Sequence, residues 1–550
     1  MTNLQIIEPH PRRGLAAFRR GEFDQLEILG EADERDFFEL CFREKILAAL
    51  AGPMPTSRAK EEVPRWFILA ANLTLRLHQE NSFLAFERVV RAGGLLSALD
   101  PAIASKHLDP QTKQILLQCL GFNHKNHYDR TPPCDQDTLR KFVKDVPSPA
   151  WLAWFNGPVQ QVFQQYGFFD PQGIFIGDGS YLFVPDNPAY EGSVVLWFDE
   201  HNHPVDYERL TAEQRKTAHR ERCYKLVSLL HLRGDCYVYA ALAVVPGNAH
   251  ECPLLYELVA NFVAAVGPGV LKLLILDRGF IDGKNLSRCK TEFGVDVLIP
   301  VKKNMDIWTD AWALSKTQRW EPLDSPAPPP RPPPPRPEPI VRREAHRQRT
   351  LSAQKAQEAP PPPAEVRVRT EGCAIKGFTS WSEASVPLHV LLLRERFADG
   401  HTAEWALMST RDFAPSRQPQ EDYQLRTEIE ERHRLLKCFH DLSDFRARAF
   451  NVIVAQVVFI LLSYTLRQWQ LWRQAQEALA GRTPVEQRRG LNVRKEYVVI
   501  YHQQAYPQML LVSFTRELLE LAPGARQKAL AKVRQLERSF LLPLKTLRPP

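Results

Sequence analysis

The sequence predicts an α/β protein in which a mixed sheet is flanked by helices. From about residue 170, short runs rich in β-branched and aromatic residues are bounded by Gly, Pro and Asp, as in GIFIGDGSYLFVP and CYVYAALAVVP. A run with helical periodicity, PLLYELVANFVAAVG, and a buried apolar run, VLKLLILDRGF, follow them. The resulting order of strand, strand, strand, helix, strand, helix and strand is typical of a mixed sheet with helices packed on it.

Residues 1–145 are expected to form a helical N-terminal domain. The runs ERDFFELCFREKILAALA and SFLAFERVVRAGGLLSALD carry apolar residues at spacings of three and four. A helical module ahead of a catalytic domain is a candidate DNA-binding unit, and plain helical packing is the alternative interpretation. The last stretch, residues 471–550, is expected to be helical and basic, with no role indicated by its sequence.

A proline-rich tract interrupts the second half of the chain. Residues 322–364 include SPAPPPRPPPPRPEP and EAPPPPAEV, and such sequence stays extended and cannot form a packed core. Strand-like text resumes after it in VPLHVLLLRERF and EWALMST. We therefore expect a disordered tether within a β-rich insertion spanning residues 306–415, with a binding site for a proline-recognising partner as the alternative.

The bulk composition is that of a globular protein. The 550 residues are 44% hydrophobic and 25% charged, and the net charge of +7 is compatible with a nucleic-acid partner but too mild to require one. Nine cysteines without a C-x-x-C pair, and no visible signal peptide, favour reduced thiols in a cytoplasmic protein. The apolar segment at 449–466 contains Asn, Gln and Ser, so we expect a buried core helix and no membrane contact.

Two aspartates stand in buried strand-like text. Asp178 lies within GIFIGDGSYLFV, and Asp277 closes VLKLLILDRGF. A carboxylate in such a place is costly unless it is paired or bound to a metal ion. The alternative for each is a turn acid that caps the next element.

The stretch YQLRTEIEERHRLLK, residues 423–437, carries three glutamates. If it forms one helix turning about 100° per residue, a polar stripe about 60° wide runs beside an apolar stripe. That polar stripe holds Tyr423, Arg426, Glu430 and Lys437. The other two glutamates face away, so the geometry singles out Glu430. Ordinary ion pairs between residues four apart are the alternative.

These residues together resemble the DDE transposases of the insertion-sequence-four type. That family carries a Tyr-x2-Arg-x3-Glu-x6-Lys signature around its third acid, and the polar stripe above matches every position and spacing. The motifs of the first two acids, Asp-Gly-Thr and Asp-x-Gly-Phe, are similar to Asp178-Gly179-Ser180 and Asp277-Arg278-Gly279-Phe280. PGNAHE at 246–251 also resembles family text, and the resemblance covers residues 170–470.

The resemblance implies a ribonuclease H-like catalytic core in two parts, residues 170–305 and 416–470, separated by the β-rich insertion. It implies that Asp178, Asp277 and Glu430 are catalytic and hold a pair of Mg²⁺ ions, for which Mn²⁺ can substitute. It also implies that three residues of the signature contact DNA phosphates: Tyr423, Arg426 and Lys437.

The implied activity is cut-and-paste DNA transposition, with metal-dependent cleavage at element ends followed by strand transfer. The implied partners are double-stranded DNA, as element ends and target, and a second copy of the chain in a synaptic homodimer. The implied location is the nucleoid of a bacterial cytoplasm. Two other classes remain open: an inactive or domesticated DNA-binding relic, and a related metal-dependent nuclease without strand transfer.

The sequence contains two weaker patterns. Cys119, His124, His127 and Cys134 fit no standard spacing of a zinc site. His250 and Glu251 match family text but are expected to cap a helix or support the site and not to bind metal directly.

Overall fold

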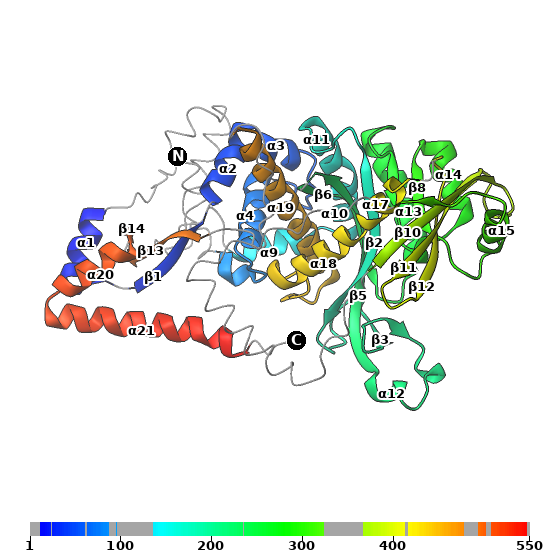
Figure 1. Cartoon of the computed structure of the whole chain (residues 1–550). Helices are drawn as coiled ribbons and strands as arrows, with labels where there is room; N and C mark the ends of the chain where they lie inside the picture. Colours follow the sequence, from blue (N-terminus) through cyan, green and yellow to red (C-terminus); the bar gives the residue numbers. More distant parts are fainter. Residues whose placement is uncertain are drawn as a thin grey trace. The chain divides into compact units, whose positions relative to one another are not determined.

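The computed structural model describes residues 11–23, 25–32, 34–60, 63–86, 95, 136–234, 236–323, 367–412, 416–477, 493–501 and 508–546. It separates the chain into two compact units, residues 1–270 with 428–550, and residues 271–427 (Figure 1). The proline-rich tract from residue 324 onward and the four residues considered for a zinc site lie outside the described residues.

The first unit contains an antiparallel sheet that carries Asp178. Its strands follow the order β4-β3-β5-β2, and β6 also pairs with β5. The long strand β5 is the centre of this sheet because it pairs with three others. The strands are β2 (Ile174–Val184), β3 (Val194–Phe198), β4 (Pro204–Val205), β5 (His219–Arg233) and β6 (Cys236–Pro246).

Two apolar helices of this unit pack on its strands. Helix α13 (Glu251–Val266) contacts β2, β5 and β6, and helix α19 (Phe450–Glu477) contacts β6. In the part of the chain that the structure describes, α19 is the one helix long and apolar enough to cross a membrane, and 89% of its apolar window is buried inside the protein. The prediction of a buried core helix at 449–466 is confirmed.

Helices from the N-terminal part of the chain surround α19. Helices α4, α9 and α10 each pack against it, and the ring of Trp151 lies 5.3 Å from that of Phe459. The N-terminal helices therefore share a hydrophobic core with the rest of the first unit. Its elements are α2 (Glu34–Arg43), α3 (Ile46–Ala51), α4 (Arg65–Leu77), η1 (Phe83–Ala85), α9 (Gln136–Asp145), α10 (Ser148–Trp154), η2 (Phe155–Val159) and α11 (Gln160–Gln165).

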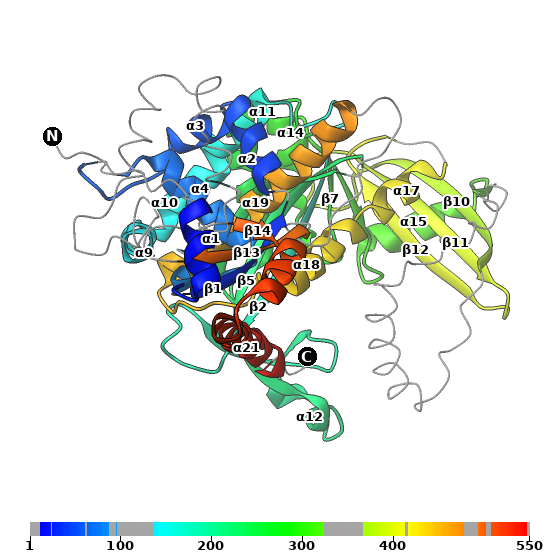
Figure 2. The same ribbon diagram turned by 90° about the vertical axis from the view of Figure 1, so that its left-hand side faces the viewer.

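The two ends of the chain build a small sheet together. Strand β1 from the N-terminal part pairs antiparallel with β13 from the C-terminal part, as Figure 2 shows. A core of side chains from both ends, including Phe18 and Phe514, holds this sheet to its helices. The elements are α1 (Pro11–Arg20), β1 (Gln25–Ala32), β13 (Val493–Tyr501), β14 (Gln508–Leu510), α20 (Leu511–Glu520) and α21 (Pro523–Thr546).

This sheet corrects the expectation of purely helical ends. The expected domains 1–145 and 471–550 each contribute strands, which the helical patterns around them concealed. The pairing joins residues more than 450 positions apart, from Gln25 opposite Tyr501 to Ala32 opposite Val493. Pairing between residues so far apart in the chain leaves no local pattern in the sequence.

The second unit contains the strand that leads to Asp277. Strands β7 and β8 are parallel, and β8 then pairs with β12, so the expected insertion continues the sheet of the expected core. The elements are β7 (Leu273–Ile275), η4 (Arg278–Phe280), α14 (Gly283–Phe293), β8 (Asp296–Pro300), α15 (Asp306–Ser315), β9 (Glu321–Pro322), β10 (Arg367–Phe378), β11 (Leu388–Phe397), β12 (Thr402–Ser409) and α17 (Gln418–Gln424). The mixed α/β prediction is confirmed, and the order of antiparallel and then parallel strands is consistent with a ribonuclease H-like core.

Candidate active site

Asp178 occupies the middle of β2, as the sequence predicted. It lies directly opposite Ser228 of β5 in the antiparallel register. Because side chains alternate along a strand, Asp178 and Ser180 share one face of the sheet and Gly179 belongs to the other. The first predicted acid therefore stands on a buried, hydrogen-bonded scaffold and not on a loop.

Helix α18 (Thr427–Phe439) presents two side chains to the Asp178 face of the sheet. The Lys437 Nζ atom donates to Ser180 Oγ at 2.8 Å. One turn earlier, His433 Nδ1 lies 3.7 Å from Asp178 Oδ2, and its Nε2 is 3.0 Å from Ser228 Oγ. These contacts join the lysine of the sequence signature to the strand of the first acid, within one unit.

Burial alters the protonation of both α18 side chains. Burial, with a smaller contribution from the nearby Lys437 charge, lowers the pKa of His433 to about 3, so the imidazole is neutral at physiological pH. Burial also lowers the pKa of Lys437 to about 8, against the attraction of the Asp178 carboxylate, which raises it. The charge that balances Asp178 is therefore a lysine that can lose its proton close to neutral pH.

On the opposite face, Gly179 leaves room for the carboxylate of Glu251. A Cβ atom at Gly179 would lie 2.2 Å from Glu251 Oε2, which no side chain tolerates without displacement. Glu251 lies 3.4 Å from Lys225 Nζ, and that amine also donates to the Ala249 carbonyl. Gly179 thus leaves space for the end of the Glu251 side chain, which a larger residue would displace. Glu251 lies on the other face of the sheet from Asp178, and its expected supporting role stays a prediction.

Glu430 lies on α18 between two glutamates that have structural partners. Glu428 accepts from the Tyr237 hydroxyl at 2.9 Å and pairs with Arg432 at 2.6 Å. Glu431 pairs with Arg434. The Glu430 side chain is exposed on the same helix.

The signature stretch is not one helix, which corrects the geometry assumed from the sequence. Helix α17 ends at Gln424 and α18 begins at Thr427. Between them, the amides of Leu425 and Arg426 bond to carbonyls three residues back, the tighter spacing of a helix end. Tyr423 therefore lies on a different helix from Glu430, and its position cannot be read from a continuous 100° rotation.

In the second unit, Asp277 combines two contacts. Its Oδ1 accepts from the Gly279 amide at 2.5 Å and so caps η4, which is the turn role weighed as an alternative. Its Oδ2 pairs with Arg426 at 2.9 Å. Arg426, which the resemblance assigns to phosphate contact, thus contacts the second predicted acid within this unit.

The remaining signature residue, Tyr423, lies in the second unit with its ring 6.2 Å from that of Trp405. In the same unit, Trp308, Trp312 and Trp320 form a chain of adjacent rings with Arg394 over two of them. They line a pocket of about 630 Å³.

In each unit, one basic residue of the signature thus lies near one of the predicted aspartates. Lys437 lies with Asp178 in the first unit, and Arg426 with Asp277 in the second. Within the described ranges, no group of three or more His, Cys, Asp or Glu side chains is arranged to hold a metal ion. Sequence reasoning missed His433, Ser228 and Lys225, whose roles depend on strand register and helix docking.

Comparisons with known proteins show the family to which this chain belongs. The family model described as transposase DDE domain matches residues 190–466, just over half of the chain. The chain belongs to this family, whose members generally use divalent metal ions. It is therefore a DNA transposase, an enzyme of DNA cleavage and strand transfer.

The chain is also similar to a solved structure. The chain is similar to a cryo-EM structure of piggyBac transposase in a synaptic complex with hairpin DNA, at 10% sequence identity and a TM-score of 0.34. The similarity covers 82% of this chain and 77% of that one. No curated protein matches the chain.

Proposed function

We propose that this transposase is of the insertion-sequence-four type and that Asp178, Asp277 and Glu430 are its catalytic acids. One observation carries the proposal: each aspartate is faced by a basic residue of the signature stretch. Lys437 donates to Ser180 on the strand of Asp178, and Arg426 pairs with Asp277. A basic signature residue near each aspartate is expected if all these groups serve one reaction.

The acids fit a site for divalent cations. Three carboxylates are hard oxygen donors of the kind that Mg²⁺ prefers, and we propose Mg²⁺, with Mn²⁺ as a substitute. A pair of such ions, when bound, activates the attacking oxygen and stabilises the leaving oxygen of a phosphodiester. Both aspartates have a cationic neighbour, which is how a partly buried carboxylate is compensated when no metal neutralises it.

The signature cations then have a second role. Arg426 offers a fork of N–H donors and Lys437 a point charge, and both suit a DNA phosphate once metal ions take over the carboxylates. The neutral His433 supports this exchange, because its Nδ1 faces Asp178 without adding positive charge. We assign Tyr423 to the same phosphate contacts through its hydroxyl.

The proposed partners are double-stranded DNA, as element ends and target, and a second copy of the chain when two ends are paired. The proposed location is the nucleoid of a bacterial cytoplasm. The group of Trp308, Trp312 and Trp320 with Arg394 gives the second unit an aromatic and cationic surface on which unpaired bases can stack.

An incubation of the protein with Mg²⁺ and DNA carrying the element ends tests the function. The ends are taken as inverted repeats flanking the coding region. Cleaved and joined products are both expected, and the variant Asp178→Asn should give neither while still binding DNA. Cleavage without joining would support a nuclease, and binding without either reaction an inactive relic.

A further inference from the structure

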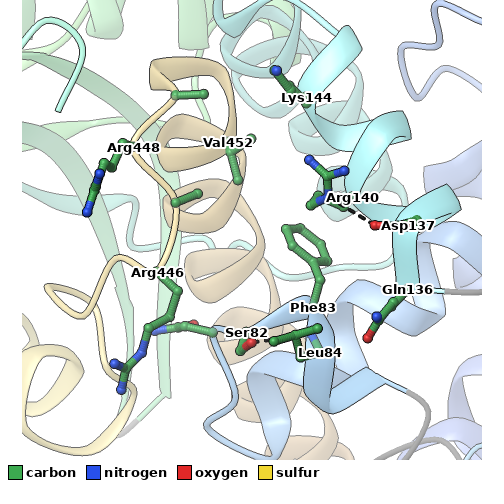
Figure 3. Close-up of a pocket in the computed structure, with 13 residues that line it drawn as sticks. Ser82, Phe83, Leu84, Gln136, Asp137, Arg140, Lys144, Arg446, Arg448 and Val452 are labelled. Atoms are coloured by element: carbon green, nitrogen blue, oxygen red, sulfur yellow. Dashed lines mark hydrogen bonds and ion pairs between the residues drawn. The ribbon is translucent and has the colours of Figure 1, made fainter. Parts of the chain in front are cut away.

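A cationic cavity of about 380 Å³ lies in the first unit, apart from the residues discussed so far. Its walls come from the segment around η1, from α9, and from the chain that links α18 to α19. Figure 3 shows Phe83 projecting between α9 and this linking segment. The volume is in the range of sites that take small ligands or part of a larger one.

The charge of the lining is predominantly positive. Arg140 and Lys144 line it from α9, and Arg446 and Arg448 from the opposite wall (Figure 3). Asp137 is the one acid among the residues that line the cavity, and it lies 3.3 Å from Arg140. Asp444, which is not part of the lining, pairs with Arg446 at 2.9 Å. Four cations against these two carboxylates leave an excess of positive charge that attracts an anion. All four basic side chains are exposed.

The rest of the lining combines apolar side chains with the polar Asn81, Ser82 and Gln136. Phe83, Val452 and two alanines contribute to it, and Leu84 beside them is 75% exposed. An aromatic ring among arginines is suited to a ligand that alternates anionic groups with flat or apolar ones. A nucleic-acid strand has this character, because phosphates alternate with sugars and bases along it.

Hydrogen bonds from two asparagine side chains hold the two walls in place. The Asn81 side chain donates to the carbonyls of Asp441 at 2.8 Å and Asp444 at 2.9 Å. Asn451 accepts from the Ser148 amide and donates to the Lys144 carbonyl. The cations therefore project from a fixed frame, which lowers the entropy lost when a ligand binds.

The linking segment also connects the cavity to the helix of Glu430. It begins where α18 ends, and the Glu191 amide donates to the Arg448 carbonyl at 3.0 Å. The Glu191 carboxylate accepts from the Phe450 amide, which starts α19. The same stretch of chain thus carries the proposed third acid and, after it, two of the cavity's cations.

We propose that this cavity binds the phosphodiester backbone of DNA, as a contact separate from the signature residues. The inference rests on the proposed function, because DNA is the polyanion that a transposase handles. Arg140, Lys144, Arg446 and Arg448 contact phosphates, and Phe83 packs against a sugar or base. These contacts position DNA without reading its sequence.

The salt dependence of DNA binding tests the proposal. The double variant Arg446→Gln, Arg448→Gln is compared with the intact protein by fluorescence anisotropy on a duplex carrying an element end. Each lost phosphate contact lowers the slope of log affinity against log salt by about 1, so we expect a decrease of about 1 to 2. Affinity at 0.1 M salt should fall by about tenfold or more. The variant Arg140→Gln, Lys144→Gln should act in the same direction.

The control variant Arg288→Gln, Lys290→Gln removes the same charge from α14, which does not line the cavity. It should leave the slope unchanged. If the intact protein binds and cleaves DNA but the cavity variants keep its slope and affinity, this inference is overturned and the proposed function stands. If the cavity variants instead lose self-association in sedimentation while DNA binding persists, the occupant is a second copy and the proposal is wrong. An intact protein that neither binds nor cleaves DNA contradicts the proposed function itself.

Discussion

Arg426 donates to the carboxylate of Asp277 at 2.9 Å, with both residues in the second unit. The arginine comes from the turn between α17 and α18, and the aspartate caps the turn after β7. The two positions are 149 residues apart in the chain, yet both belong to motifs singled out in the sequence. A metal ion that binds Asp277 must compete with this guanidinium.

Removal of that competitor should strengthen metal binding. The variant Arg426→Gln leaves Asp277 without its charged partner, so Mn²⁺ binding in the absence of DNA should tighten severalfold by calorimetry, whereas DNA-end binding should weaken. A charge-assisted contact is typically worth about 1.5–3 kcal/mol, and its partial exposure reduces that value. Arg434→Gln, which removes an exposed arginine paired with Glu431 on α18, is the matched control. Unchanged metal affinity in Arg426→Gln would separate Asp277 from the metal site.

Neighbouring glutamates on α18 should give opposite phenotypes. Glu430→Gln should abolish strand cleavage, by a factor of about 10³ or more if a metal is lost, and leave DNA binding and thermal stability nearly intact. Glu428→Gln should retain cleavage but lose about 1–2 kcal/mol of stability, because the Tyr237 hydroxyl and Arg432 lose a charged acceptor. Cleavage assays and thermal unfolding on both variants check this. Loss of cleavage from folded Glu428→Gln, with Glu430→Gln active, would move the third acid by two positions.

His433 should act as a positioning residue for Asp178. With its proton on Nδ1, the His433 ring directs this N–H toward the Asp178 carboxylate. Its Nε2 then accepts from the hydroxyl of Ser228, the residue opposite Asp178 on β5. His433→Gln disturbs this arrangement, and supporting contacts of this kind typically change metal affinity by about tenfold. We expect the Mg²⁺ concentration for half-maximal cleavage to rise accordingly while DNA affinity is unchanged.

The matched control is His440→Gln, which replaces another buried histidine of the same unit, one packed on Tyr464. It should leave the metal midpoint in place even if it lowers stability. Equal midpoints in all three proteins would remove His433 from the site.

Much of the fold could be predicted because strands and helices leave local patterns. The strand of Asp178 and the buried helix at 449–466 follow from runs of apolar and β-branched residues. Strand β1 could not be predicted in this way, because it is stabilised by pairing with β13 at the far end of the chain. Long-range pairing adds no periodicity to the sequence.

The candidate site divides in the same way. Spacing within a motif identified Arg426 and Lys437, but it could not show that each faces a different aspartate. It also missed the break between α17 and α18, because the apolar pattern of YQLRTEIEERHRLLK continues through the turn. His433 has helical spacing to Lys437, yet its contact with Ser228 depends on which face of β5 the helix covers.

His231 should make the protein less stable in acid. It is buried on β5, and burial lowers its pKa to about 4, with a small contribution from Arg233 and against the opposing effects of Asp170 and the Ile174 carbonyl. Below pH 6.5, the ordinary value, the unfolded chain takes up a proton that the folded protein refuses. The contribution is therefore fully present above pH 6.5 and declines as the pH falls toward 4, by up to about 1.4 kcal/mol per pH unit.

Denaturant unfolding between pH 4 and pH 7.5 measures this effect. The variant His231→Asn should have a lower free energy of unfolding at pH 7.5 and a flatter dependence on pH. His201→Gln, which replaces an exposed histidine, should follow the intact protein. Parallel curves for His231→Asn and the intact protein would show that His231 is not the group responsible.

Removal of residues 326–364 should leave the second unit folded. On either side of this tract, β9 pairs with β10, and the Leu323 amide donates to the Thr370 carbonyl at 2.9 Å. The flanking chain is therefore anchored by its own strand pairing, and a shorter connection costs less closure entropy. We expect the Tm to change by less than about 2 °C in calorimetry. Leu323→Ala, which truncates a side chain only 7% exposed, should lower stability by about 2–5 kcal/mol and shows that the assay detects damage at this place. A deletion as harmful as Leu323→Ala would mean that the tract packs on the fold, because the strand pairing beside it is intact in both proteins.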